Sequence, residues 1–427
     1  MGLITNPIIA EYGTWFLILA LLFGLYLTWG IGANDVSNAI GTSVGSGALT
    51  IKQGIIIAGI FEFAGALLAG GRVADTLKAG IVDASYLSAT PELFILGMLA
   101  ALLAAGTWTM LASSRGWPVS TTHAIVGALV GFGVVGIGIQ GVHWQGMSEI
   151  AASWVFSPVL SAIIGYLLMR SVQTLVFESN DPFASAGRLG PAFVFLAGYA
   201  VALLTLAEGL KNYDLNLNLA DTQKGAILTG IICAIISMFL IRRIKIDKTA
   251  DQHFHFASVE KIFAPMMIFS ACAMAFAHGS NDVGNGIGPI AAIFSMVQSA
   301  SLATAQTPIP LWLLLAGGVA ILVGVVTYGF EVIKTIGARI TELTPSRGYC
   351  ATLGAAITVS LASGLGLPVS TTHIAVGAVI GVGLARGISA LDTRVLGTIL
   401  LTWFTTLPVS ALLAAVFFYA LRGLFQI

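Results

Sequence analysis

Apolar stretches, most of them long enough to cross a lipid bilayer, recur from one end of this chain to the other. They fall near residues 14–31, 54–70, 93–112, 119–139, 150–170, 190–207, 225–241, 262–277, 287–297, 311–330, 350–364, 369–384 and 396–421. Because a bilayer offers no water to the backbone, only helices and closed barrels span it. Runs of this length exclude the alternating ten-residue strands of a barrel. Only 9% of the residues are charged, so we predict an all-helical, multi-pass membrane protein.

A polar motif interrupts two of these apolar stretches. The first copy lies within Gly32–Gly41 and the second within Gly279–Gly288. Each places an aspartate between asparagines, at Asn34, Asp35 and Asn38 and again at Asn281, Asp282 and Asn285. An aspartate at the centre of a membrane helix costs about 2.5–3.5 kcal/mol on insertion scales, so such residues are functional candidates.

The spacing within this motif favours a cation site. If the motif is locally helical, its aspartate and asparagines lie three and four residues apart and share one face. Carboxylate and amide oxygens suit a hard cation such as sodium, joined by backbone carbonyls if the helix is broken at the glycines. A proton carrier would need only the aspartate. The structural alternative is that these side chains merely join helices by hydrogen bonds.

A second motif, Pro-Val-Ser-Thr-Thr-His, occurs identically at 118–123 and 368–373. Proline favours the first turn of a helix, and three hydroxyls then accompany unpaired backbone N–H groups at the positive end of the helix dipole. This arrangement suits an anion, and phosphate is one that such termini hold. The candidate anion ligands are Ser120, Thr121, Thr122, Ser370, Thr371 and Thr372. The alternative is an ordinary capped helix start.

Three further residues belong with these motifs. Glu62 is another acid within an apolar stretch, and we expect it to lie on the ion pathway. His123 and His373 follow the hydroxyls directly. Either they pack with a satisfied hydrogen bond, or they have a pH-sensitive role near the site.

The two motif pairs indicate an internal duplication. We expect a first transmembrane repeat at 1–170 with a re-entrant helical hairpin near 93–139, and a second at 262–427 with a hairpin near 350–384. Connecting helices occupy 171–261. The basic loop 242–261 is assigned to the cytoplasm by the positive-inside rule, which places both termini outside and gives the repeats opposite orientations. Inverted repeats, each with a broken helix, are the usual plan of secondary transporters.

The two motif pairs together resemble the inorganic phosphate transporter family of sodium- or proton-coupled symporters. The stretch from Gly32 to Ala39 is very close to the family's N-terminal signature, and both Pro-Val-Ser-Thr-Thr-His elements match its hairpins. The resemblance implies that Asp35 and Asp282 bind coupling cations, that the six hydroxyls hold phosphate and that Glu62 is needed for transport. It also raises a homodimer as an alternative to a monomer.

We therefore predict a transporter in the cell (inner) membrane that imports inorganic phosphate with sodium by alternating access, without a cofactor. The alternatives are coupling to protons, transport of a metal–phosphate complex, or transport of another tetrahedral oxyanion. An intramembrane enzyme is disfavoured, because a catalytic site needs one motif set where this chain has two. A passive channel is disfavoured by paired hairpin tips. With a formal net charge of zero and scattered charges, the chain has no basic face for nucleic acid.

Overall fold

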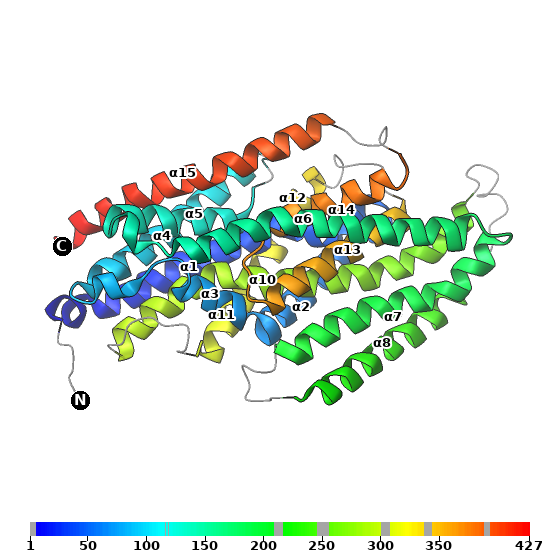
Figure 1. The fold of residues 1–427 in the computed structure, drawn as a ribbon, viewed down its shortest axis with the longest axis horizontal. Helices are drawn as coiled ribbons and strands as arrows, with labels where there is room; N and C mark the ends of the chain where they lie inside the picture. Colours follow the sequence, from blue (N-terminus) through cyan, green and yellow to red (C-terminus); the bar gives the residue numbers. More distant parts are fainter. Residues whose placement is uncertain are drawn as a thin grey trace.

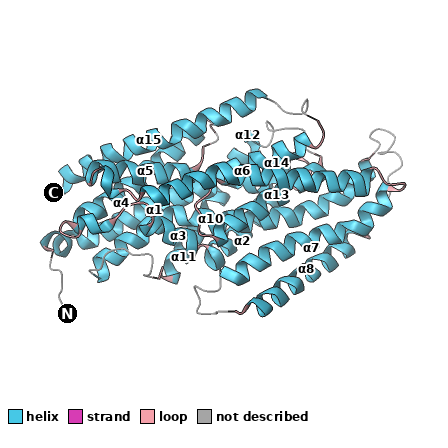
Figure 2. Ribbon diagram, viewed as in Figure 1, coloured by secondary structure: helices cyan, strands magenta, loops and turns pink. Residues whose placement is uncertain are grey.

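The structure is a computed structural model that describes residues 6–115, 117, 119–208, 217–245, 256–299, 308–336, 344–387 and 393–427. Pro118 and half of the predicted loop 242–261, namely 246–255, lie outside these residues. The described elements are helices, drawn as one elongated bundle in Figures 1 and 2. Eight of them are long and apolar enough to cross a membrane. The prediction of an all-helical, multi-pass membrane fold is confirmed.

Among the described residues, the α-helices form two sets of six with a pair between them. The first set is α1 (Pro7–Gly45), α2 (Ile51–Ala69), α3 (Gly71–Ala79), α4 (Pro91–Ser114), α5 (Thr121–Gly136) and α6 (Trp144–Val172). The second set is α10 (Ala257–Ser299), α11 (Leu311–Thr327), α12 (Gly329–Ile336), α13 (Pro345–Gly364), α14 (Thr371–Leu384) and α15 (Thr393–Phe425). The pair is α7 (Pro182–Glu208) and α8 (Leu219–Ile241), which lie along one side of the bundle in Figure 1.

The two sets pack reciprocally. Helix α1 lies against α4 and α11, while α10 lies against the corresponding α13 and α2. Helix α6 covers the hairpin α13–α14, and α15 covers the hairpin α4–α5, as Figure 1 shows. Each half therefore encloses the hairpin of the other half, which is the packing expected of two related repeats. The hairpin tips are thereby held in the interior, between the long helices α1 and α10.

The motif helices are continuous, and the prediction of a broken helix in each repeat is wrong. Helix α1 runs for 39 residues and α10 for 43, each without interruption through its aspartate motif. The stretches expected at 262–277 and 287–297 are therefore parts of one helix. The motif side chains hydrogen-bond to the hairpins, so the backbone does not have to open to supply polar groups. The motif glycines serve close packing instead of a helix break.

Four glycines bring the long helices into backbone contact at two equivalent crossings. Where α10 crosses α2, a Cβ on Gly279 would collide with the carbonyl oxygen of Glu62, and one on Gly65 with that of Phe276. Where α1 crosses α11, a Cβ on Gly32 would collide with the carbonyl oxygen of Ile321, and one on Gly324 with that of Trp29. Small residues at helix crossings allow this approach in membrane proteins.

The base of each hairpin is tied to the start of a long helix. Asn6, the N-cap of α1, donates from Nδ2 to Glu92 Oε2 at 2.7 Å at the start of α4. In the other half, Glu260 near the start of α10 accepts from the backbone N–H of Ser346 at 2.7 Å and from its hydroxyl at 2.8 Å. Both hairpins are thus fixed at their bases by a buried carboxylate.

Substitution of Gly65 by alanine is expected to destabilise the protein. The added methyl group forces α2 and α10 apart, and such overpacking costs about 1–3 kcal/mol. Gly423→Ala is the matched control, because its Cβ meets nothing within 4 Å and alanine favours the helix by up to about 1 kcal/mol. The measurement is thermal unfolding in detergent, and equal unfolding temperatures for the two variants would contradict the close crossing.

Candidate functional site

The site begins with the capped starts of α5 and α14. Ser120 and Ser370 are the N-cap residues, and their hydroxyl oxygens accept hydrogen bonds from the backbone N–H groups of His123 and His373 at 3.1 and 3.2 Å. This is ordinary N-cap geometry, and it fixes the first turn of each helix. Both serines are buried, so these helices start in the protein interior.

A threonine of each hairpin donates to the aspartate of its own half. Thr121 Oγ1 lies 2.8 Å from Asp35 Oδ2, and Thr371 Oγ1 lies 3.1 Å from Asp282 Oδ2. All four residues are buried. The predicted cation motif and the predicted anion motif are therefore in direct contact, through the same bond in both halves.

The remaining motif residues join the two halves to each other. Asn38 Nδ2 donates to Thr372 Oγ1 at 2.9 Å, and Asn285 Nδ2 donates to Thr122 Oγ1 at 3.1 Å. The Thr122 hydroxyl in turn donates to the carbonyl oxygen of Val369 at 3.0 Å. The two hairpin tips thus meet at one place, and this network closes around them.

Asn34 and Asn281 hold the turns of the hairpins. The Ser113 hydroxyl donates to Asn34 Oδ1 at 2.9 Å. In the second half, Asn281 Nδ2 donates to Ser363 Oγ and to the carbonyl oxygen of Leu367, both at 3.1 Å. These bonds connect each motif helix to the end of the first hairpin helix, so a movement of either tip must disturb the aspartate motif.

The two aspartates differ in what they leave available. Asp35 Oδ1 accepts from Asn34 and Asn38, at 3.0 and 3.2 Å, and its Oδ2 accepts from Thr121. Within the described part of the chain, Asp282 Oδ1 and Asn285 Oδ1 are buried oxygens without a hydrogen-bond partner. Unpaired buried oxygens of this kind are what a hard cation requires. In this arrangement the second motif offers them.

Sequence reasoning missed His278, one turn before Asp282. Its Nε2 lies 3.0 Å from Asp282 Oδ2 and its Nδ1 lies 3.2 Å from Glu62 Oε1, with all three side chains fully buried. Ligand atoms of Asp35, His278 and Asp282 lie within 4.8 Å of one another. The two motifs therefore share one centre, and Glu62 lies beside it. The available signal was a histidine on the same helix face as Asp282, at a spacing of four residues.

His123 and His373 lie behind the tips and contact each other. Their ring centroids are 4.4 Å apart, and the Trp154 ring lies 4.0 Å from His123. Trp154 Nε1 donates to the carbonyl oxygen of Pro368 at 2.9 Å, which fixes the indole against the second tip. Of the two alternatives left open by the sequence, this geometry favours packing between the hairpins.

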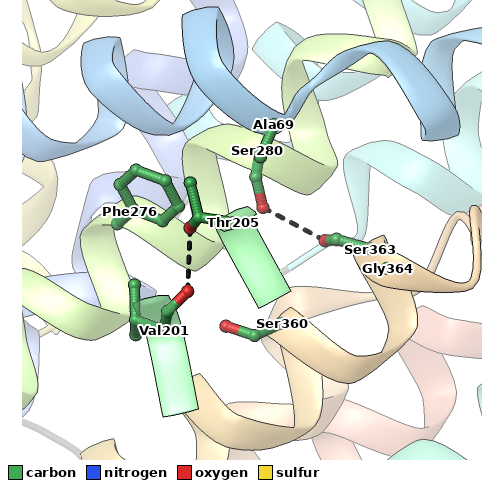
Figure 3. Close-up of a pocket in the computed structure, with 8 residues that line it drawn as sticks. All are labelled: Ala69, Val201, Thr205, Phe276, Ser280, Ser360, Ser363 and Gly364. Atoms are coloured by element: carbon green, nitrogen blue, oxygen red, sulfur yellow. Dashed lines mark hydrogen bonds between the residues drawn. The ribbon is translucent and has the colours of Figure 1, made fainter. Parts of the chain in front are cut away.

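A polar hollow adjoins the second hairpin tip. It is small, with a volume of about 20 Å³, and is lined by Ala69, Val201, Thr205, Phe276, Ser280, Ser360, Ser363 and Gly364. Figure 3 shows Ser280 and Ser363 in contact at 3.2 Å, with the Ser360 hydroxyl near them. Ser363 Oγ also accepts a hydrogen bond from Asn281 Nδ2, so the lining of this hollow contacts the second motif directly.

A multi-pass helical protein with paired aspartates and two hairpin tips at one buried centre has the plan of a secondary transporter. Comparison with known proteins makes the assignment specific. The model of the phosphate transporter family matches residues 31–414, and the chain belongs to this family.

Individual relatives cover nearly the whole chain. A Haemophilus influenzae protein provisionally named a phosphate permease is 43% identical over 422 residues, covering 98% of this chain and 100% of the relative. The chloroplastic inorganic phosphate transporter 2-1 of Arabidopsis thaliana is 43% identical over 415 residues, covering 93% of this chain and 70% of the relative. A solved structure of a protein named the sodium-dependent phosphate transporter matches with a TM-score of 0.89 and 37% identity, covering 96% of this chain and 99% of that one.

Replacing Thr121 or Thr371 by valine is expected to destabilise the protein by about 1–3 kcal/mol, because each change leaves a buried carboxylate oxygen short of a donor. The measurement is thermal unfolding of the purified protein without added ligand. The control is Thr358→Val, which removes a buried hydroxyl bonded only within its own helix. Equal stability of the three variants would argue against the threonine–aspartate bonds.

Proposed function

We propose that this protein imports inorganic phosphate by symport with sodium, through alternating access about the centre where the hairpin tips meet. The observation that carries the proposal is the bond from each tip threonine to an aspartate, because it connects the cation and anion ligands directly. Membership of the phosphate transporter family supports phosphate as the substrate. Similarity to a solved transporter that is named as sodium-dependent supports sodium.

The threonine–aspartate bonds suggest how the two substrates are coupled. Each aspartate competes with an incoming anion for the hydroxyl of Thr121 or Thr371. A cation bound to the carboxylate weakens its hold on the hydroxyl, which then becomes available to phosphate. The opposite charges of the two substrates add to this effect. By linkage, bound phosphate strengthens cation binding by the same factor.

The phosphate itself would be held at the starts of α5 and α14. Both helices begin at the centre with their positive dipole ends, and the first-turn backbone N–H groups are natural anion donors. Ser120 and Ser370 accept one of these N–H groups each as caps, while their hydroxyl hydrogens stay available as donors. Thr122 and Thr372 complete the candidate set at the junction of the tips.

The cations would be held by the two asparagine–aspartate motifs. In the part of the chain that the structure describes, Asp282 Oδ1 and Asn285 Oδ1 are oxygens open to a cation, and Asp35 would supply a second carboxylate nearby. Oxygen ligands of mixed carboxylate and amide type favour sodium over a proton, which needs a single carboxylate. Glu62 adds a third carboxylate beside this centre, where its Oε1 lies against Nδ1 of His278.

The proposal includes the placement of the protein in the cell (inner) membrane. The positive-inside rule puts the loop between α8 and α10 in the cytoplasm and both termini outside. A sodium gradient directed inward would then drive phosphate into the cell. The homodimer implied by the family resemblance belongs to the proposal as well, and the mass of the purified protein in detergent measures it.

An imposed inward sodium gradient is expected to drive uptake of labelled phosphate into proteoliposomes above the external concentration. A proton gradient at equal sodium on both sides is the matched comparison and is expected to drive little uptake. Arsenate and sulfate serve as competitors that define the anion. Accumulation with the proton gradient alone would replace sodium by protons as the coupling ion, and uptake that never exceeds equilibrium would indicate a channel.

Asp35→Asn and Asp282→Asn are each expected to abolish sodium-driven phosphate accumulation, because a neutral amide cannot balance the charge of the cation. Thermal unfolding distinguishes this loss from misfolding, since asparagine keeps the shape of the side chain. Asp221→Asn is the control, because Asp221 is half exposed and paired with the exposed Lys224 on α8. Accumulation like that of the wild type in both motif variants would contradict the cation assignment.

A further inference from the structure

One buried polar pair lies beside the second aspartate and has no counterpart beside the first. His278 bridges Glu62 and Asp282, at 3.2 and 3.0 Å. Neither the family assignment nor the two recurring motifs account for this bridge. Glu62 comes from α2 in the first half and His278 from α10 in the second, so the pair also joins the two halves.

The positions equivalent to Glu62 and His278 are found at the other crossing, where α1 packs on α11. Gly279 packs on the backbone of Glu62, and the equivalent Gly32 packs on the backbone of Ile321. His278 directly precedes Gly279, as Ile31 directly precedes Gly32. A fully buried isoleucine pair, Ile31 and Ile321, therefore takes the place of the histidine and glutamate. The backbone frame is the same at both crossings, but the chemistry differs.

This difference changes how each aspartate is held. Asp35 is surrounded by neutral donors, two amides and one hydroxyl, which occupy both of its oxygens. Asp282 has the His278 imidazole and the Thr371 hydroxyl on the same oxygen, Oδ2. Its Oδ1 has no hydrogen-bond partner in the described part of the chain. The imidazole lies against Oδ2, so Oδ1 is the oxygen of Asp282 that is left for a cation.

The free-energy cost of burying His278 and Glu62 at this crossing argues for a role of the two residues in transport. A buried ion pair can often be replaced by apolar residues of similar volume without loss of stability, whereas removal of one partner is costly. The other crossing, of α1 with α11, shows that isoleucines fit these positions. Stability alone therefore gives no reason for a histidine and a glutamate at the second crossing.

We propose that His278, itself held by Glu62, is a positioning residue that orients Asp282 with Oδ1 toward the cation, and that it gives the two aspartate motifs different affinities for sodium. The inference rests on the proposed function, in that sodium is taken as the coupling ion. It assigns the stronger sodium site to the second motif, where the carboxylate is fixed and one oxygen is open.

The test is to give the second crossing the chemistry of the first, in the variant Glu62→Ile/His278→Ile. Sodium-driven phosphate uptake is measured in proteoliposomes at varied sodium and saturating phosphate, and then at varied phosphate and saturating sodium. The half-saturating sodium concentration is expected to rise at least about ten-fold, with the phosphate KM changed less than about two-fold. A merely structural role would lower the maximal rate and leave the half-saturating sodium concentration unchanged.

Single variants separate positioning from simple loss of charge. His278→Ile leaves Glu62 buried beside Asp282 without the imidazole, so it is expected to impair sodium dependence and stability more than the double variant. Glu62→Gln removes one charge but keeps a carbonyl oxygen for His278 Nδ1, so it is expected to raise the half-saturating sodium concentration less than the double variant does. The matched control, Ile31→Val/Ile321→Val, changes the first crossing without polar groups and is expected to leave sodium dependence unchanged.

The outcomes distinguish this inference from the proposed function. If sodium does not stimulate the wild type, the proposed function fails. If the wild type is sodium-dependent and the double isoleucine variant keeps its half-saturating sodium concentration, the positioning role of His278 is wrong. Should the double variant fail to fold, His278→Gln and His278→Leu decide the matter. Gln keeps a donor for Asp282 and Leu does not, and equal sodium dependence of these two would overturn the inference.

Discussion

The bond from a hairpin threonine to a membrane-buried aspartate is the interaction on which the rest of this structure depends. It occurs twice, at Asp35 and at Asp282, and it brings a helix start that favours an anion against a carboxylate that favours a cation. A buried charge is costly in a membrane unless it is satisfied, and this bond supplies the donor. In the proposed transport, either ligand has to disturb this bond to bind.

The centre could form only because the helices approach closely. Gly32, Gly65, Gly279 and Gly324 let α1 and α10 lie directly on the backbones of α11 and α2. These crossings bring both motifs to one place, where ligand atoms of Asp35, His278 and Asp282 lie within 4.8 Å of one another. The two equivalent crossings also differ in their chemistry. One carries a histidine and a glutamate where the other carries two isoleucines.

Much of this architecture could be predicted from the sequence. Apolar length and low charge determined the helical membrane fold, and the repeated motifs named the residues that meet at the hairpin tips. Other features could not be predicted from the sequence. The motif helices are continuous, because hydrogen bonds such as Asn38 to Thr372 satisfy the motif side chains without opening the backbone. The sequence left two alternatives for His123 and His373, and only the packing of the hairpins, which brings their rings 4.4 Å apart, favours one of them.

The sequence by itself determined the chemistry of the site, because residue type and spacing settle which groups share a helix face and which helix starts can hold an anion. The tertiary structure decided which of these groups are neighbours. Glu62 and His278 are more than two hundred residues apart, and no periodicity connects them. Their contact depends on the crossing of α2 and α10, so only packing could show that His278 bridges two acids and that Asp282 keeps an open oxygen where Asp35 does not.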